Sequence, residues 1–126
     1  MLKLMLFAGC GGFIGSCGRY LVNRLCTHLW HSGFPAGTFI VNIIGCFLFG
    51  LFTGLFQRNS MMSEQANIIL VTGFCGGFTT FSTFSGDIYS LFSKGEWLTA
   101  SVYLTLSIII GITMVIAGRY IALRGI

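Results

Sequence analysis

Long stretches without a charged side chain dominate this sequence. Residues 25–57, 65–86 and 97–118 contain no Asp, Glu, Lys or Arg. Because about 20 mainly apolar residues in a helix cross the hydrocarbon core of a bilayer, the second and third stretches each fit one membrane span. The first stretch contains a polar turn and then an apolar run at 36–56, which fits another. The pattern predicts three spanning helices, approximately over 36–56, 66–90 and 97–118.

A fourth span lies at the N-terminus, where a charge interrupts it. Too few uncharged residues separate Lys3 from Arg19 to cross a bilayer, so this helix must occupy about 4–25. Arg19 is then expected inside the helix near one membrane face, where its side chain either reaches toward the interface or serves a function. With only 8% charged residues, against ~25% in soluble domains, we expect residues 1–126 to form one all-α transmembrane domain.

The basic residues are distributed almost evenly between the two sides of the membrane. Four spans place both termini on one side, with Lys3, Arg58, Arg119 and Arg124, and leave on the other Arg19, Arg24 and Lys94. Chains with one fixed orientation concentrate Lys and Arg in cytoplasmic loops, so this balance favours insertion in both orientations. Oppositely oriented copies can pair about a two-fold axis, which predicts an antiparallel, dual-topology homodimer. Orientation by a weak bias from the tail is the alternative.

Two GxxxG motifs predict close helix contacts. One is formed by Gly11 and Gly15 in the first expected helix, and the other by Gly50 and Gly54 in the second. Small residues at this spacing let two helix backbones approach each other within a membrane. The motif indicates tight packing without naming the partner helix.

The third expected span contains the unusual stretch VTGFCGGFTTFSTFSG. Gly73, Gly76 and Gly77, followed by Thr79 and Thr80, are poor helix formers and predict a break near the middle of the membrane. Backbone groups freed by a break must be buried in protein, bind an ion or line a wet cavity. Free carbonyl oxygens would suit a small cation such as Na⁺.

Aromatic and hydroxyl side chains follow this break in a regular order. Phe81 and Phe84 are three residues apart and share a helix face, while Thr79, Ser82 and Thr83 supply neighbouring hydroxyls. A phenyl ring has a positive edge, so rings turned edge-on to a path favour an anion, and hydroxyls can donate hydrogen bonds to it. The alternative is that the rings face lipid or the core, and that the hydroxyls bond to their own helix.

Other polar side chains lie within the second and fourth spans. An unpartnered amide in the otherwise apolar run around Asn42 costs several kcal/mol, so Asn42 either joins two helices or donates to a permeating anion. Tyr103, Ser107 and Thr113 add hydroxyls to the fourth span, with Tyr103 and Ser107 four residues apart on one face. These residues can form a polar track drawn from several helices.

Three segments, GGFIGSCGRY, GTFIVNIIGCFLFG and GFCGGFTTFSTFS, closely resemble in order and spacing the motifs of the Fluc (CrcB-type) fluoride channels of microbes. The resemblance covers nearly the whole chain. It implies four transmembrane helices per subunit with a broken third helix, and an antiparallel homodimer with two fluoride pores and a central structural Na⁺. It further implies passive export of cytoplasmic fluoride across the inner or plasma membrane, which confers fluoride resistance.

The resemblance also assigns residues. It implies a fluoride pore lined by Phe81, Phe84, Asn42, Ser82, Thr83 and Tyr103. It places Arg19 in the vestibule at the pore mouth. It implies that the backbone carbonyls of Gly76 and Thr79 hold Na⁺, two from each subunit. The expected partners are fluoride, membrane lipid and a second copy of the chain, with no nucleic acid.

Two other classes of function remain open alternatives. A dual-topology small-molecule exporter driven by protons needs a titratable carboxylate within a span, whereas Glu64, Asp87 and Glu96 are all expected at span ends. A structural membrane subunit would account for the glycines and the balanced charge, but not for the Phe and Thr rows. The sequence contains no nucleophile–base pairing or phosphate-binding loop, so we do not expect an enzyme.

Overall fold

The computed structural model describes residues 1–30, 33–59 and 61–125. In order, the elements are α1 (Leu2–Leu29), α2 (Ala36–Arg58), α3 (Glu64–Asn67), the π-helix η1 (Ile68–Cys75), α4 (Gly76–Phe78), α5 (Phe81–Ser93) and α6 (Trp97–Arg124). Within the described residues, four segments are long and apolar enough to cross a membrane: Leu2–Leu29, Ala36–Arg58, Glu64–Ser93 and Trp97–Arg124. The predicted all-α chain with four such segments is confirmed.

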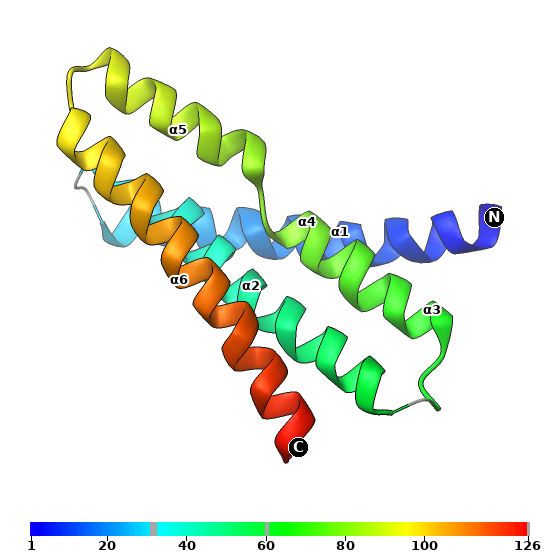
Figure 1. Cartoon of the computed structure of the whole chain (residues 1–126). Helices are drawn as coiled ribbons and strands as arrows, with labels where there is room; N and C mark the ends of the chain where they lie inside the picture. The colour runs from blue at the N-terminus through cyan, green and yellow to red at the C-terminus, as the bar shows by residue number, and fades with distance from the viewer. Residues whose placement is uncertain (31–32, 60, 126) are drawn as a thin grey trace.

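The helices pack as two pairs that meet along α1 and α2. The most extensive contact is between α2 and α6, and the next is between α1 and η1. Figure 1 shows α3, η1 and α4 running back alongside α1, after which α5 turns away and meets α6 at their connecting turn. Because α5 makes its main contacts with α6, one side of α5 stays uncovered within the subunit.

Glycines allow α1 to approach the backbone of the third segment. A Cβ at Gly11 or Gly15 would overlap the carbonyl oxygens of Ile69 and Phe74, respectively. From the other side, a Cβ at Gly73 would lie 2.6 Å from the Ala8 oxygen. The first GxxxG motif therefore packs inside the subunit, against η1 and α4.

The second GxxxG motif serves the α2–α6 pair. A Cβ at Gly50 would overlap the carbonyl of Val115, and one at Gly54 would lie 2.8 Å from the Ala122 Cβ. On α6, Gly118 is equally close to the backbone of α2. The tight packing that both motifs predict is thus observed, and its partners are helices of the same chain.

Within the stretch that was predicted to break the third helix, the glycines keep helical geometry. Gly73 lies in η1 and Gly76 and Gly77 lie in α4, all with helical geometry. The backbone becomes extended only at Thr79 (φ −85°, ψ 159°) and Thr80 (φ −150°, ψ 122°). Packing against α1 explains Gly73 and Gly77, because a larger residue at either would meet the backbone of that helix.

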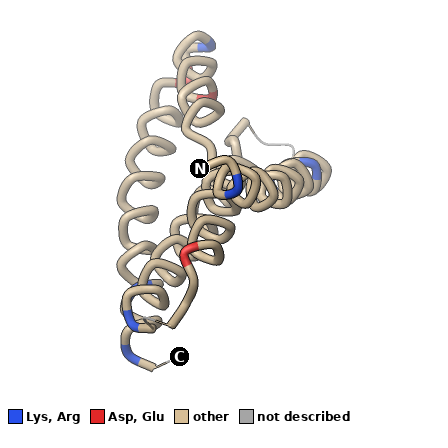
Figure 2. The backbone as a smooth tube through the Cα atoms, turned by 90° about the vertical axis from the view of Figure 1, so that its right-hand side faces the viewer, with Lys and Arg blue, Asp and Glu red and all other residues tan. Residues whose placement is uncertain are grey.

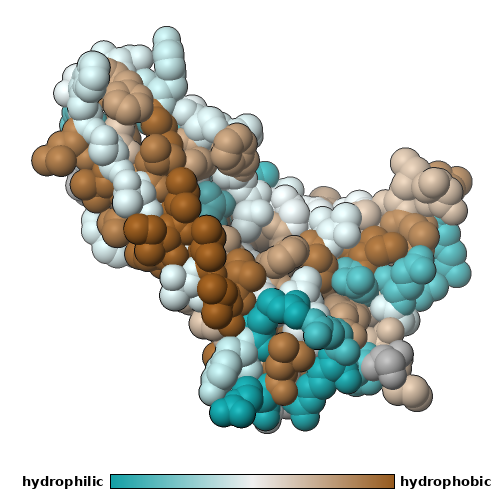
Figure 3. All heavy atoms as spheres, in the orientation of Figure 1, coloured by the Kyte–Doolittle hydropathy of each residue, from teal (hydrophilic) through white to brown (hydrophobic). Residues whose placement is uncertain are grey.

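The surface of the subunit is largely apolar. Figure 3 shows hydrophobic side chains gathered along α6, where Ile109, Ile112 and Ile116 are exposed. Figure 2 shows Lys and Arg at opposite ends of the fold, as at the C-terminal end of α5 (Lys94) and of α6 (Arg124). Exposed aliphatic faces with charges toward the ends are what a lipid-embedded helix requires.

A small aromatic core attaches α5 to α6. Tyr103 is fully buried, and it packs with Phe84 and Leu91 of α5 and with Ala100. The Tyr103 ring centre lies 5.1 Å from that of Phe84 and 5.4 Å from that of Phe34. This cluster fixes the position of α5, and hence of the residues that follow the extended segment.

Candidate functional site

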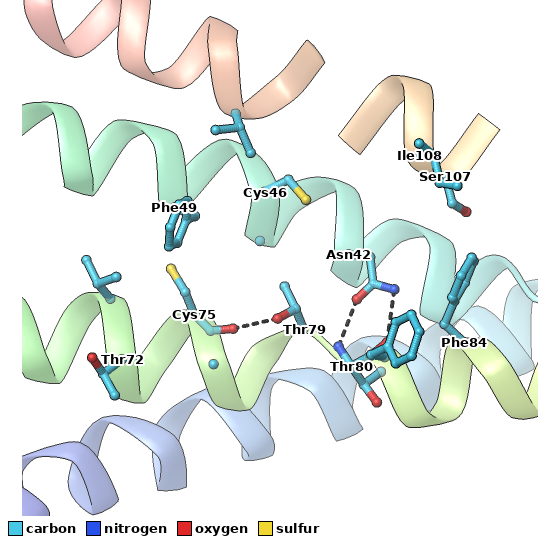
Figure 4. A pocket seen from close by; sticks show the side chains of 15 residues that line it. Asn42, Cys46, Phe49, Thr72, Cys75, Thr79, Thr80, Phe84, Ser107 and Ile108 are labelled. Atoms are coloured by element: carbon cyan, nitrogen blue, oxygen red, sulfur yellow. Dashed lines mark hydrogen bonds between the residues drawn. The ribbon is translucent and has the colours of Figure 1, made fainter. Parts of the chain in front are cut away.

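A cavity of about 610 Å³ lies between α2, η1, α4, α5 and α6. Its lining includes several residues expected at the functional site, namely Asn42, Gly76, Thr79, Phe81 and Phe84. Figure 4 shows these residues on facing helices, with Asn42 bonded to Thr80 toward the end where Phe84 lies. The structure therefore brings together residues that are distant in the sequence.

Phe81 and Phe84 begin α5 and lie beside each other. Their ring centres are 6.1 Å apart and their planes are tilted by 43°. Phe84 is 8% exposed, whereas Phe81 is 79% exposed. The expected aromatic pair is thus a pair in space, with one ring anchored in the core and the other uncovered at the cavity edge.

Asn42 bonds the backbone of Thr80 in both directions. Its Nδ2 donates to the Thr80 carbonyl at 3.2 Å, and its Oδ1 accepts from the Thr80 N–H at 2.9 Å (Figure 4). Both backbone groups belong to the extended segment, where helical partners are lost. Asn42 therefore joins α2 to the extended segment, which was the first of the two roles predicted from the sequence. This contact uses one of its two amide hydrogens.

The threonine and serine hydroxyls around this segment are largely occupied by local bonds. Thr79 Oγ1 donates to the Cys75 carbonyl at 2.8 Å. Thr80 Oγ1 accepts from the Thr83 N–H at 3.2 Å, as an N-cap of α5, and lies 3.4 Å from the Ser82 hydroxyl. Ser82 and Thr83 are exposed and do not line the main cavity, so the subunit alone does not bring them beside both rings.

Thr83 instead lines a second cavity of about 380 Å³, together with Asp87 and residues of α1 and α2. Asp87 accepts a hydrogen bond of 3.1 Å from the Tyr103 hydroxyl. Asp87 lies in α5, which continues to Ser93, and its side chain is half-buried. Tyr103 has its hydroxyl committed to this carboxylate and does not line the main cavity.

Arg19 reaches from α1 to the end of α4. Its Nε donates to the Gly77 carbonyl at 3.0 Å, and the side chain is half-buried. The last carbonyls of a helix lack intrahelical donors and carry partial negative charge, which a guanidinium stabilises. In the subunit this arginine therefore holds the end of α4 against α1.

Ser107 also lines the main cavity, although the resemblance does not assign it to the pore. Its Oγ is buried and has no hydrogen-bond partner among the described residues, and Figure 4 shows it near Phe84 at the cavity. By contrast, Thr113 donates to the Ile109 carbonyl of its own helix at 2.7 Å. In the sequence, Ser107 was indicated only by its spacing of four residues from Tyr103. That spacing does not reveal which of the two hydroxyls lacks a hydrogen-bond partner.

Comparison with known proteins identifies the family. The family model described as "CrcB-like protein, Camphor Resistance (CrcB)" matches residues 6–119. The chain belongs to the CrcB family. Three similar relatives are each named "Fluoride-specific ion channel FluC". The relative from Azobacteroides pseudotrichonymphae genomovar CFP2 is 42% identical over 118 residues, or 94% of both chains.

The other two relatives cover the chain equally well. The FluC of Rhizobium johnstonii is 44% identical over 118 residues, 94% of both chains. That of Chlorobaculum tepidum is 42% identical over 122 residues, 97% of this chain and 96% of the relative. The similarity to CrcB-family proteins therefore extends through all four long helical segments, as the resemblance read from the motifs implied.

The two residues that the resemblance assigns to a small cation both belong to the lining of the cavity in this CrcB-family chain. Gly76 and Thr79 both line it, and the Cβ position of Gly76 meets no atom within 4 Å. Backbone carbonyls are hard ligands, which replace water around alkali ions without adding charge. The residues that the resemblance assigns to Na⁺ therefore fit that ion in their chemistry and in sharing one cavity.

Proposed function

We propose that this protein is a fluoride-selective channel through which cytoplasmic fluoride leaves the cell passively. The observation that carries the proposal is the similarity to relatives named fluoride-specific ion channels, over 94% or more of their length. Fluoride enters a cell as neutral HF, which crosses lipid and dissociates inside. A channel lets the trapped anion leave down the membrane potential, which gives fluoride resistance without a catalytic step.

The geometry of the cavity supports this function. Phe81 and Phe84 lie beside it at the start of α5, and the unbonded hydroxyl of Ser107 faces it. Ring edges and hydroxyl donors can replace the hydration of a small anion without a fixed charge that would hold it too tightly. Asn42 has a second amide hydrogen for the same purpose, and Ser82 and Thr83 would contribute hydroxyls further along the path. Tyr103 would contribute its hydroxyl there only on releasing Asp87.

The working unit in this proposal is an antiparallel dimer with two pores. The exposed Phe81 and the uncovered side of α5 leave the lining of the cavity incomplete in one subunit. A second copy, inverted in the inner or plasma membrane, would complete it, and the balanced distribution of Lys and Arg favours such pairing. The third segment would cross as one span, Glu64–Ser93, interrupted at Thr79 and Thr80.

Na⁺ would bind at the centre of this dimer. The carbonyls of Gly76 and Thr79 from both subunits would hold it, and its charge would stabilise the interrupted backbone. Arg19, which bonds Gly77, would add positive potential near the pore mouth.

A proton-coupled exporter is the second candidate, and Asp87 is the observation that favours it. This carboxylate is half-buried within α5, where a coupling group would be needed. Its bond from Tyr103 gives it a structural role instead. An exporter requires a pH gradient for net transport, whereas a passive channel requires only the anion gradient and a counter-ion path.

Fluoride efflux from liposomes tests the proposal. Purified protein is reconstituted in K⁺-fluoride liposomes without a pH gradient, valinomycin is added, and a fluoride electrode follows release beside a matched chloride run. A selective channel releases fluoride rapidly and chloride slowly. Release that requires a pH gradient would favour the exporter, and no release from a folded dimer would contradict the channel.

A further inference from the structure

Two side chains redirect backbone N–H groups at the extended segment between α4 and α5. In a continuous α-helix, each N–H bonds the carbonyl four residues earlier. The Thr80 N–H would then bond the Gly76 carbonyl, and the Thr83 N–H would bond the Thr79 carbonyl. In the structure neither does so.

Each of these N–H groups bonds a side-chain oxygen instead. The Thr80 N–H donates to Asn42 Oδ1 at 2.9 Å, and the Thr83 N–H donates to Thr80 Oγ1 at 3.2 Å. The carbonyls that lose their helical donors are therefore those of Gly76 and Thr79. Both residues line the main cavity.

Neighbouring carbonyls are bonded. The Cys75 oxygen accepts from the N–H of Thr79 at 3.0 Å and from its hydroxyl at 2.8 Å. The Gly77 oxygen accepts from Arg19 Nε at 3.0 Å, and the Thr80 oxygen accepts from Asn42 Nδ2 at 3.2 Å. The carbonyls of Gly76 and Thr79 thus lose their helical donors because side chains take the two N–H groups. The three neighbouring carbonyls each accept a hydrogen bond from another donor.

We propose that Asn42 and Thr80 are positioning residues for cation binding: their side-chain oxygens take two backbone N–H groups and so leave the Gly76 and Thr79 carbonyls available to Na⁺. The inference rests on the proposed function, because it concerns the Na⁺ site assigned there. Neither side-chain oxygen needs to touch the ion. Thr80 has no other assigned role, which makes it the cleaner test.

Removing the Thr80 hydroxyl frees the Thr83 N–H to bond the Thr79 carbonyl. Thr80→Val keeps the shape of the side chain and lets α5 begin earlier, so the carbonyl is occupied by protein. Thr80→Ser keeps the hydroxyl and the bond. Thr113→Val is the matched control, since it removes a hydroxyl that bonds only its own helix, on α6.

The measurement is the thermal stabilisation of the purified dimer by Na⁺, titrated against N-methylglucamine at constant ionic strength. We expect Thr80→Val to lower the apparent Na⁺ affinity by about tenfold, the effect of one lost carbonyl ligand. Thr80→Ser and Thr113→Val should match the wild type. Equal Na⁺ dependence of Thr80→Val and the wild type would overturn the inference.

A second pair of variants carries the test if Thr80→Val does not fold. Asn42→Asp keeps an oxygen for the Thr80 N–H, whereas Asn42→Leu removes it and lets that N–H return to Gly76. We expect Asn42→Leu to lose more Na⁺ stabilisation than Asn42→Asp, and the reverse order would contradict the proposal. Wild-type protein that releases fluoride but is not stabilised by Na⁺ would overturn this inference while leaving the channel function intact.

Discussion

The rings of Phe81 and Phe84 are in contact distance of each other, at 6.1 Å between centres, but only Phe84 is held by the core of its own subunit. Phe84 packs on Tyr103, whereas Phe81 is exposed at the cavity edge. The two rings therefore differ in what their substitution removes. A change at Phe81 alters the cavity surface, while a change at Phe84 also alters the contact between α5 and α6.

Replacing either ring by an aliphatic side chain should reduce fluoride flux. Phe81→Ile and Phe84→Ile remove the positive ring edge, and we expect efflux to fall by about tenfold or more in each. Phe84→Ile should also lower the free energy of unfolding by about 1–3 kcal/mol, because it alters a packed site. Phe92→Ile is the control on the same helix, since that ring pairs with Trp97. Unchanged flux in both pore variants would exclude an aromatic path.

Tyr103→Phe separates a structural role from a role in the pore. It removes the hydroxyl that donates to Asp87 Oδ2 and should cost about 1–3 kcal/mol of stability, measured by thermal unfolding in detergent. Asp87→Asn in addition should cost less than the sum of the single changes, because the two groups interact. Tyr89→Phe, at an exposed position of α5, is the control. If Tyr103→Phe abolished flux at full stability, its hydroxyl would belong to the ion path.

Alanine at the packing glycines should destabilise the subunit. A Cβ at Gly15 would overlap the carbonyl of Phe74, and one at Gly50 would overlap that of Val115. We expect Gly15→Ala and Gly50→Ala each to cost about 1–3 kcal/mol, as helices are forced apart. Gly86→Ala meets no atom within 4 Å and should be tolerated. Equal melting temperatures for all three variants would contradict the observed helix contacts.

Orientation can be shifted by charge at the C-terminus. Two lysines added after residue 126 should favour one insertion direction, because positive residues near a span are retained in the cytoplasm. Antiparallel dimers are then limited by the minority orientation, so fluoride efflux per copy should fall. Two added glutamines are the control. Efflux that stays constant while accessibility of a C-terminal tag becomes one-sided would argue against antiparallel pairing.

Much of the architecture followed from the distribution of charge. Residues 25–57, 65–86 and 97–118 lack charges because a bilayer excludes them, and this pattern correctly predicted three of the four long apolar helices. The fourth, at the N-terminus, followed from the length that a span needs when Arg19 lies inside it. The motif resemblance named the family, which the comparisons bear out. The periodicity and hydropathy of the sequence could not predict which side chains form hydrogen bonds with one another. Those bonds depend on how helices that are distant in the sequence pack against each other.

Three details of the site illustrate that gap. Gly73 was expected to weaken a helix by propensity, but tertiary packing on α1 overrides that preference. Asn42 had two equally reasonable roles until Thr80 was placed opposite it. The distance of Asp87 from other charges could not predict its partner, which is the buried hydroxyl of Tyr103 on α6.

The π-helical geometry of η1 makes the length of this segment as specific as its side chains. Each turn of η1 has more residues than an α-helical turn. The side chains of Ile68–Cys75 therefore point in other directions around the helix axis than they would in an α-helix. Deleting one residue there would rotate the preceding part of the segment about the helix axis relative to the following part. Gly73 and Gly77 and residues 64–67 would then no longer keep their present orientation relative to each other around the helix axis. Insertions and deletions in η1 should therefore be far less tolerated than substitutions on its outer face.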